Sequence, residues 1–521
     1  MSIINTHTFW NYILNESEII TNRCMNLLTR KYWNVEKEEY DLHTYYTIVS
    51  TFGWRKVLRF PAGLTAWLAK EADLEIEDKP LRDKTYTEED VLTAAKQVQL
   101  INPKFEIRDY QLEAALTSLN QFSSLIHASI GSGKTSIMSL ICKVFSEKRI
   151  LILNDNNKIL DQIYERICSF GMEDEVSWHP SEEPDYSARI VLINSSTSDS
   201  RLNSQNEDYI NFLKEVNVWI VDECHKIQAL TEFEPVFYMD QDKLQHIVGY
   251  SGSPFRNYKY PYKNEQDFRT IAILGEPAFT YEMKNAIQDG NIAQPYSYFI
   301  NYKNKTPYLL PQFKNSYFMQ YRMSITYNKN RNAAGLAMLK FLNKNGIKTL
   351  ASYNTIKPGQ NMMKSLAEEG IKTLFICGAD TIHEWKPNKR GTLKLETRKG
   401  GVEDVKAALH GDYNIIFASQ VMDEGVDIDI FQAAVLFSAG KTPIANIQRI
   451  GRSSRRRTGE PNVSFVVDFK DIDGLHIFRD HYEQRKQMMI DSGVKNIEKV
   501  KDFCDLIEKI NNCRKNSLEN L

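Results

Sequence analysis

A short glycine-rich stretch runs Ala128-Ser129-Ile130-Gly131-Ser132-Gly133-Lys134-Thr135. It follows an apolar run typical of a buried strand and precedes a helical pattern, which is the context of a phosphate-binding loop. Backbone N–H groups at a helix N-terminus can converge on phosphate oxygens, and the two glycines allow a close approach. Lys134 would then reach the β- and γ-phosphates, and the hydroxyl of Thr135 would bind Mg²⁺. The stretch predicts a nucleoside triphosphate site.

An acidic pair follows the apolar run 218–221, in the sequence Asp222-Glu223-Cys224-His225. Carboxylates at the carboxyl end of a parallel strand are placed to organise Mg²⁺ in a nucleoside triphosphatase. Asp222 would hold the metal, and Glu223 would orient and deprotonate the attacking water. Upstream of the glycine-rich stretch, Gln111 carries a donor and an acceptor on one amide, which can read an adenine edge.

Apolar runs alternate with helical patterns in two segments of the chain, and this alternation indicates α/β sheets. The first segment holds the glycine-rich stretch, and the second begins near residue 325. In the second segment Gln448, Arg452 and Arg455 occupy positions i, i+4 and i+7 of a predicted helix, so they share one face. Two guanidinium groups on that face can meet a γ-phosphate bound by the first segment. A basic surface helix is the alternative.

Residues 1–100 contain no catalytic motif, but they interleave aromatic and basic side chains. That pattern fits a nucleic-acid surface, because rings stack on bases and cations meet phosphates. It also fits a small α+β domain with an aromatic core. Thr87, followed by three acidic residues, predicts the start of a helix. From residue 476 onward the pattern is helical and highly charged.

The composition is that of an ordinary globular protein of about three domains, with 521 residues, 25% charged and 42% hydrophobic. No apolar run approaches the ~18 residues that span a bilayer, and no secretion signal precedes the first domain, so we expect a cytoplasmic protein without membrane contact. Seven cysteines without a C-x-x-C pair indicate reduced thiols. A formal net charge of −2 means that any contact with nucleic acid depends on local patches.

Several motifs occur in a fixed order, and together they resemble the superfamily 2 helicases and translocases over about residues 104–470. They are Arg108-Asp109-Tyr110-Gln111, Gly131-Ser132-Gly133-Lys134-Thr135, Asp222-Glu223-Cys224-His225, Ser251-Gly252-Ser253-Pro254, Gly425-Val426-Asp427 and the segment 448–455. Within the superfamily the chain looks most similar to the phage UvsW-type DNA helicases. Members of that family use ATP to unwind branched DNA, migrate junctions and anneal strands.

The resemblance implies roles for individual residues. Arg108 and Gln111 would contact adenine, Asp427 the ribose, and Arg452 and Arg455 would act as arginine fingers. The implied nucleotide-binding set is Arg108, Gln111, Ile130, Gly131, Ser132, Gly133, Lys134, Thr135, Gly425 and Asp427. The implied catalytic set is Lys134, Asp222, Glu223, Gln448, Arg452 and Arg455, with Thr135 and Asp222 as Mg²⁺ ligands. Coupling of hydrolysis to motion falls to His225, Ser251 and Ser253, and contact with the nucleic-acid backbone to Ser195, Thr197, Tyr353, Asn354 and Ser419. The sequence departs from the family pattern at Ile130, where Thr is common, and at Asn154-Asp155-Asn156-Asn157.

The predicted fold is two tandem RecA-like α/β domains with parallel sheets, a small N-terminal α+β domain and a C-terminal helical extension. We expect an accessory domain at 1–100, with DNA binding as one interpretation, lobes at 101–300 and 301–470, and a helical segment at 471–521. The predicted function is an ATP- and Mg²⁺-dependent DNA helicase, monomeric, acting on branched or partly single-stranded DNA in phage-type recombination, repair or replication. An RNA helicase of the same superfamily and an ATPase switch without unwinding are the alternatives.

Overall fold

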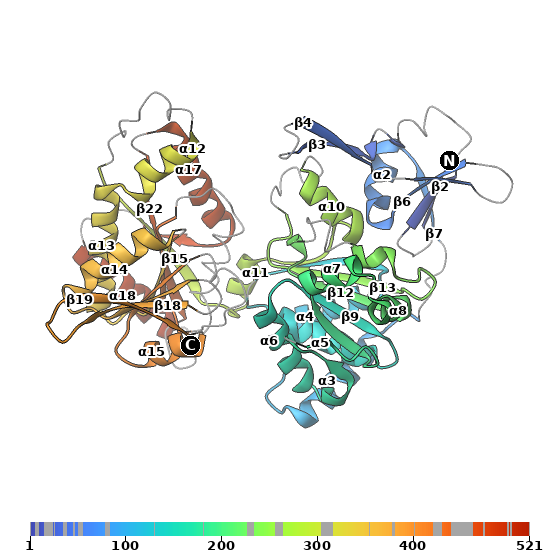
Figure 1. Ribbon diagram of the computed structural model, residues 1–521, viewed down its shortest axis with the longest axis horizontal. Helices are drawn as coiled ribbons and strands as arrows, with labels where there is room; N and C mark the ends of the chain where they lie inside the picture. The colour runs from blue at the N-terminus through green and yellow to red at the C-terminus, as the bar shows by residue number, and fades with distance from the viewer. Residues whose placement is uncertain are drawn as a thin grey trace. The chain divides into compact units, whose positions relative to one another are not determined.

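The computed structural model forms two compact units, Met1–Tyr281 and Glu282–Leu521 (Figure 1). The structure describes residues 2–5, 10–14, 24–25, 27–34, 39–44, 47–50, 56–78, 84–129, 131–180, 182–226, 234–255, 264–303, 316–353, 355–377, 381–400, 402–419, 430–438, 462–472, 475–497, 500 and 503–519. Among these residues, no helix combines the length and the apolar character needed to cross a membrane.

The first unit begins with a five-stranded sheet in the order β5-β6-β2-β1-β7, which packs onto the larger sheet of the same unit. Its elements are β1 (Ser2–Asn5), β2 (Trp10–Leu14), β5 (Thr47–Ser50), β6 (Lys56–Pro61), α2 (Thr65–Ala72) and β7 (Glu75–Asp78), with a separate hairpin of β3 (Thr29–Asn34) and β4 (Glu39–Thr44). A Cβ on Gly63 would lie 2.2 Å from the carbonyl oxygen of Ile271, so the close approach of these two segments requires glycine. The predicted small α+β domain is confirmed, and it shares one hydrophobic core with the rest of the first unit.

The larger sheet of the first unit has seven parallel strands in the order β10-β11-β9-β12-β13-β8-β14. The strands are β8 (Ser123–Ala128), β9 (Ile150–Asn154), β10 (Val176–Ser177), β11 (Ile190–Asn194), β12 (Val218–Asp222), β13 (His246–Ser251) and β14 (Pro277–Tyr281). The helices are α3 (Glu88–Ile101), α4 (Asp109–Leu119), α5 (Lys134–Val144), α6 (Asn157–Cys168), α7 (Ser195–Asn203), α8 (Glu207–Glu215) and α10 (Glu265–Leu274). Every residue of β9, β12 and β13 is buried, as the near-continuous apolar runs predict for a parallel sheet covered on both faces.

The second unit is built on a nine-stranded sheet in the order β19-β18-β17-β20-β16-β21-β22-β15-β23. The strands are β15 (Gln294–Ile300), β16 (Thr349–Ser352), β17 (Thr373–Cys377), β18 (Thr381–Pro387), β19 (Leu393–Lys399), β20 (Ile415–Ala418), β21 (Ala433–Leu436), β22 (Val463–Phe469) and β23 (Lys495–Asn496). The helices are α11 (Met283–Gln288), α12 (Tyr317–Tyr321), α13 (Lys329–Lys344), α14 (Ile356–Ala367), α15 (Val402–His410), α17 (His476–Asp491) and α18 (Phe503–Glu519). All neighbouring strands run parallel except at β17, β18 and β19, where a hairpin extends the sheet edge.

Buried charges join the C-terminal helix α17 to the second sheet. The guanidinium of Arg485 pairs with Asp468 at 2.8 Å and with Asp471 at 2.9 Å. Arg331, at the start of α13, pairs with the other oxygen of Asp471 at 3.0 Å and donates to the carbonyl of Phe437 at 2.6 Å. The predicted helical extension is therefore confirmed as an integral part of the second unit.

The expected fold class, two α/β domains with parallel sheets and flanking helices, is confirmed. The expected division of the chain into lobes stays a prediction. Strand β15 lies before position 301, in the range expected for the first lobe, and yet it pairs with β22 in the second sheet.

Candidate active site

The glycine-rich stretch connects β8 to α5 and forms a cradle for an anion. Gly131 and Gly133 have φ of 80° and 79°, which is the left-handed region, and Gly133 caps the N-terminus of α5. The backbone N–H of Ser132 donates to the carbonyl of Ser129 at 3.2 Å, which closes the turn. The hydroxyls of Ser129 and Ser132 are buried and have no hydrogen-bond partner among the described residues. Free donors at a helix N-terminus suit a phosphate group.

The segment before α4 holds the cradle from one side. The amide of Gln111 accepts from the backbone N–H of Arg108 at 3.1 Å and donates to the carbonyl of Ser132 at 2.9 Å. Tyr110 donates its hydroxyl to the same carbonyl at 2.8 Å and stacks on Tyr281, with ring centroids 3.8 Å apart. Both ends of the Gln111 amide thus take part in positioning the loop, and each keeps one further hydrogen or lone pair for a ligand.

An open pocket of about 410 Å³ lies beside this contact. Phe105, Arg108, Gln111, Gly133 and Arg166 are among the residues that line it. The pocket combines an aromatic ring, an amide and two guanidinium groups next to the phosphate cradle, so its chemistry suits a nucleobase. Arg108 and Gln111 lie where the sequence places adenine recognition, and that role stays a prediction.

The acidic pair lies at the carboxyl end of β12, close to the cradle. The ammonium of Lys134 lies 3.9 Å from Oε1 of Glu223 and 3.4 Å from the carbonyl oxygen of Ala128. Asn154, at the end of the neighbouring strand β9, donates to Oδ2 of Asp222 at 3.3 Å. Burial, and secondly the charge of Glu223, raise the pKa of Asp222 well above its ordinary value, while Lys134 acts in the opposite direction.

The donor set fits Mg²⁺. The cation prefers carboxylate and hydroxyl oxygens, and Asp222 and Thr135 supply one of each. The Oδ1 atom of Asp222 is buried without a hydrogen-bond partner among the described residues, so it is available to a ligand. A divalent cation would also stabilise the carboxylate form of Asp222 against its burial.

A short relay leads from Glu223 to the end of β13. The carboxylate of Glu223 lies 3.4 Å from Nδ1 of His225, and that nitrogen shares a hydrogen bond of 3.0 Å with the hydroxyl of Ser251. The same hydroxyl accepts from the backbone N–H of Ser253 at 3.1 Å. Glu223 has φ of 49°, an unusual value for a residue with a Cβ, and such strain is common at functional sites. The structure therefore brings Glu223, His225, Ser251 and Ser253 into one chain of contacts.

The remaining predicted residues of the first unit lie at the same sheet edge. Ser195 begins α7 directly after β11, and it is buried, while Thr197 is half-buried in the first turn. In the second unit, Tyr353 follows β16 and Ser419 follows β20, so both lie at the carboxyl edge of the second sheet. The backbone N–H of Ser419 donates to the carbonyl of Ile376 at 3.2 Å.

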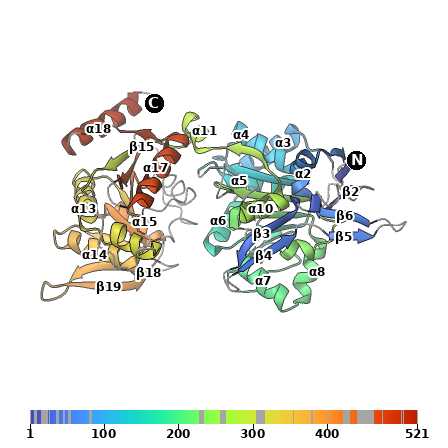
Figure 2. The same ribbon diagram turned by 90° about the horizontal axis from the view of Figure 1, so that it is seen from above.

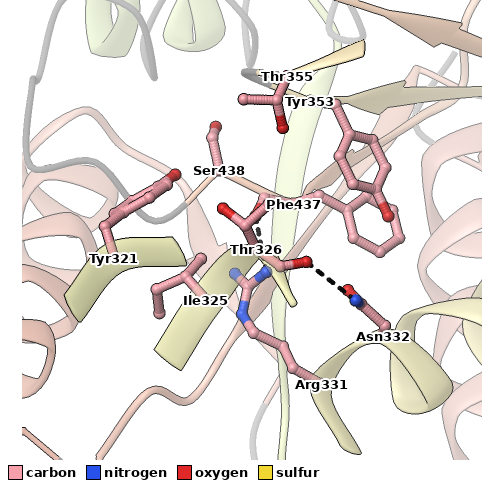
Figure 3. A pocket seen from close by; sticks show the side chains of 9 residues that line it. All are labelled: Tyr321, Ile325, Thr326, Arg331, Asn332, Tyr353, Thr355, Phe437 and Ser438. Atoms are coloured by element: carbon pink, nitrogen blue, oxygen red, sulfur yellow. Dashed lines mark hydrogen bonds between the residues drawn. The ribbon is translucent and has the colours of Figure 1, made fainter. Parts of the chain in front are cut away.

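Figure 3 shows a small pocket in the second unit, lined by Tyr353, Thr355, Arg331 and Ser438 among others. Its volume of about 10 Å³ holds no more than one water molecule, so it excludes a base or a phosphate in this conformation. Tyr353 stacks on Phe437 with centroids 4.4 Å apart and is buried. The ring therefore serves packing here.

Seven predicted site residues lie outside the described part of the chain. They are Ile130, Asn354, Gly425, Asp427, Gln448, Arg452 and Arg455. Their roles stay predictions.

Three residues of the site have roles that the sequence did not indicate. Asn154 contacts Asp222, and Tyr110 and Tyr281 brace the cradle. The position of Asn154 after an apolar strand was a usable signal, because strand ends in parallel sheets meet at one edge. The stacking of Tyr110 on Tyr281 had no such signal, since it depends on β14 lying beside β8.

Comparison with known proteins finds two matching families and several relatives. Residues 104–256 match the family described as the type III restriction enzyme res subunit, and residues 333–457 match the helicase conserved C-terminal domain. "Putative helicase 22" of the Sulfolobus islandicus filamentous virus is 23% identical over 484 residues, 87% of this chain and 77% of that protein. The Aspergillus terreus "ATP-dependent DNA helicase mph1" is 33% identical over 97 residues, which are 19% of this chain and only 8% of that protein.

A match to a solved structure with a TM-score above 0.5 supports the fold. S. cerevisiae Dbp5 bound to RNA and ADP BeF3 aligns over 82% of this chain and 96% of that one, with 13% identity and a TM-score of 0.52. T4 UvsW aligns over 95% of this chain and 99% of that one, with 15% identity and a TM-score of 0.42. The two family matches, in this order and on two α/β sheets, indicate a superfamily 2 helicase.

Proposed function

We propose that the protein is an ATP-driven DNA helicase or translocase that remodels branched DNA. The observation that carries the proposal is the meeting of Lys134, Asp222 and Glu223 at one edge of the first sheet. An ammonium for phosphate, a carboxylate for Mg²⁺ and a second carboxylate for water are the parts that phosphoanhydride hydrolysis needs. In a helicase, such hydrolysis drives movement along nucleic acid.

The geometry suggests how the bound nucleotide activates Glu223. Lys134 is held between Glu223 and the carbonyl of Ala128, and the side chains of both charged residues are mostly buried. A γ-phosphate in the cradle carries more negative charge than one carboxylate, so it draws the ammonium away from Glu223. Glu223 is then able to accept the proton of a water aligned with the phosphate. Bound Mg²⁺ would supply neutralisation of the phosphate charge, with Thr135 and Asp222 as its ligands.

The second unit would complete the catalytic site. We propose that Gln448, Arg452 and Arg455 reach the γ-phosphate, because donors placed on another unit make hydrolysis sensitive to the movement of the two units. Gly425 and Asp427 would contact the nucleotide in the same arrangement. Ser195, Thr197, Asn354 and Ser419 would contact the nucleic-acid backbone, whereas the ring of Tyr353 is buried against Phe437 and is not counted in this surface.

The choice of DNA rests on two supports. The motif set resembles that of the phage UvsW-type DNA helicases, and the mph1 relative is named as a DNA helicase. The likeness to Dbp5, solved with RNA, keeps an RNA substrate as the second candidate.

The test is ATP hydrolysis by the purified chain with single-stranded DNA, duplex DNA, a four-way DNA junction or RNA. We expect the junction to stimulate hydrolysis most. Glu223→Gln keeps the size of the side chain but removes the base, so hydrolysis should fall by about 10²-fold or more. Strand displacement, measured on a labelled fork, separates a motor from an ATPase switch.

Each result has one meaning. Stimulation by RNA alone would keep the ATP site but overturn the DNA substrate. Stimulation by DNA without displacement or junction movement would favour the switch. Full hydrolysis by Glu223→Gln, or by Lys134→Ala, would contradict the site itself.

A further inference from the structure

The hairpin of β18 and β19 extends the second sheet beyond the helices that cover it. Figures 1 and 2 both show the two strands side by side at the margin of the second unit. Strand β18 pairs with β17 and with β19 in antiparallel register, whereas the sheet next to them is parallel. Strand β19 is therefore the edge strand, and most of its side chains are exposed.

Among the described residues, the contacts that cover the two faces of the hairpin extend no further than Trp385. On one face the indole N–H of Trp385 donates to the carbonyl of Gln360 in α14 at 2.9 Å. On the other face Ile382 packs with apolar residues of α15, and Arg398 pairs with Asp404 at 2.7 Å. Beyond these contacts, the residues 386–392 and Lys394 are exposed.

The exposed end of the hairpin is strongly basic. Residues 381–399 include six Lys or Arg and two Glu, in a chain whose formal net charge is −2. Lys386 pairs with Glu384 at 3.0 Å and with Glu396 at 3.5 Å. Lys389, Arg390 and Lys394, here called the hairpin tip, have no acidic partner within the described part of the chain. Lys386 is shared by two carboxylates, and the cations of the hairpin tip give this end of the hairpin a net positive charge.

The basic tip is not explained by folding stability. Lys386 and Lys394 are directly opposite in the register, and like charges in that position destabilise a strand pair. Lysines can protect an edge strand from aggregation, which accounts for Lys394. Edge protection does not explain Lys389 and Arg390, because these residues lie in the turn and not in the paired strands.

The turn fixes the backbone that carries Lys389 and Arg390. The side chain of Asn388 accepts from the backbone N–H of Arg390 at 2.9 Å and from that of Thr392 at 3.0 Å. Asn388 and Thr392 are also joined through their backbones at 2.9 Å, and Gly391 has φ of 77°. The backbone of this turn therefore loses little further entropy when its cations bind an anion, and the cost of binding is limited to the side chains.

We propose that the hairpin tip is an auxiliary binding surface for the phosphate backbone of duplex nucleic acid. Cations carried on an ordered backbone suit the regularly spaced phosphates of a duplex. Surfaces for single strands also need exposed aromatic rings for base stacking, and the ring of Trp385 is half-buried against α14. The inference rests on the proposed function in one respect, that the protein acts on nucleic acid.

The test is the salt dependence of binding, measured by fluorescence anisotropy with duplex DNA, duplex RNA and single-stranded DNA, without nucleotide. The variant Lys389→Gln/Arg390→Gln removes two charges and leaves the backbone bonds of the turn intact. On duplex DNA we expect the slope of log affinity against log salt to become shallower by about 1.8, since each lost phosphate contact contributes about 0.9. The slope for single strands should stay unchanged.

The control variant is Lys340→Gln/Lys344→Gln, which removes the same charge from α13 in the same unit. It should keep the duplex slope of the parent protein, and both variants should keep the basal ATP hydrolysis. An unchanged duplex slope in the hairpin variant overturns the proposal, as does an equal change in the control or a larger change with single strands. Aggregation of the hairpin variant with an unchanged slope assigns the cations to edge protection and also overturns it. If the parent protein binds none of the nucleic acids, the proposed function fails. If the parent binds nucleic acid and the hairpin variant has the same duplex slope as the parent, the hairpin inference alone fails.

Discussion

Gly133→Ala tests whether the nucleotide cradle depends on the contact between its glycine and Gln111. The residue has φ of 79°, and an L-residue with a Cβ costs about 1–2 kcal/mol in that region. A Cβ at this position would lie 2.5 Å from Nε2 of Gln111, so the amide must move and lose its hydrogen bond to Ser132. A buried hydrogen bond of this kind contributes about 1 kcal/mol. The cradle is therefore disfavoured by about 2–3 kcal/mol in the variant.

This cost appears in nucleotide binding. The variant relieves the strain by leaving the cradle conformation, and the nucleotide must restore that conformation in order to bind. At 1.4 kcal/mol for each factor of ten, the Kd of a fluorescent ATP analogue should rise about 30- to 150-fold. Equilibrium titration with Mg²⁺ present measures it.

Two controls separate the contributions. Gly370 has φ of 77° and no heavy atom within 4 Å of an added Cβ, so Gly370→Ala introduces strain without a clash and far from the cradle in sequence and unit. It should leave the Kd unchanged.

The second control is Gln111→Ala, which removes the clashing amide. The double variant Gly133→Ala/Gln111→Ala should therefore lose about 1 kcal/mol less binding free energy than the sum of the losses in the two single variants. A Kd for Gly133→Ala within about twofold of the parent would refute the reasoning, because strain alone exceeds that change.

Three other predictions follow from buried contacts. Asn154→Ala removes the donor that holds Asp222, so kcat for ATP should fall about tenfold while the Kd of the nucleotide stays near that of the parent; an unchanged kcat would reduce Asn154 to a packing residue. Arg331→Met leaves Asp471 with one of its two buried cations, so the free energy of unfolding should fall by about 3 kcal/mol in urea titrations, and a loss below about 1 kcal/mol would contradict the structure. Burial raises the pKa of Cys142 from 9.0 to about 12, so the folded state keeps a proton that the unfolded state loses. Relative to Cys142→Ala, the stability of the parent should be constant below pH 9 and fall by about 1.4 kcal/mol per pH unit above it, as followed by urea titration; a constant difference up to pH 10 would contradict the assignment.

Local patterns in the sequence predicted those elements whose physics is local. Thr87 begins α3 with a capping box, in which its side chain and that of Asp90 bond each other's backbone. The glycines of the cradle have the left-handed dihedrals that their residue type allows. Strands such as β12 could be predicted because burial on both faces requires a continuous apolar run.

The hairpin of β18 and β19 could not be predicted in this way. Its residues carry no continuous apolar run, because most side chains of β19 are exposed and the core contacts come from Ile382 and Trp385 of β18. The contact of Asn154 with Asp222 depends on the order of strands in the sheet, where β9 lies beside β12. Strand order depends on how the whole chain packs, and it cannot be read directly from a single sequence.

The chain of contacts from Lys134 through Glu223 and His225 to the end of β13 connects the nucleotide cradle to the turn after that strand. Glu223 lies between the ammonium of Lys134 and the imidazole of His225, so a change in charge at the cradle alters the balance of both contacts. When a γ-phosphate draws Lys134 away, the carboxylate of Glu223 loses its cation and interacts more strongly with His225. His225 bonds the hydroxyl that also holds the backbone of Ser253, so we expect the turn after β13 to respond to a bound nucleotide. We infer that this turn is where the first unit converts the state of the nucleotide into movement, because here a change of charge at Glu223 reaches a hydrogen bond to the backbone of Ser253.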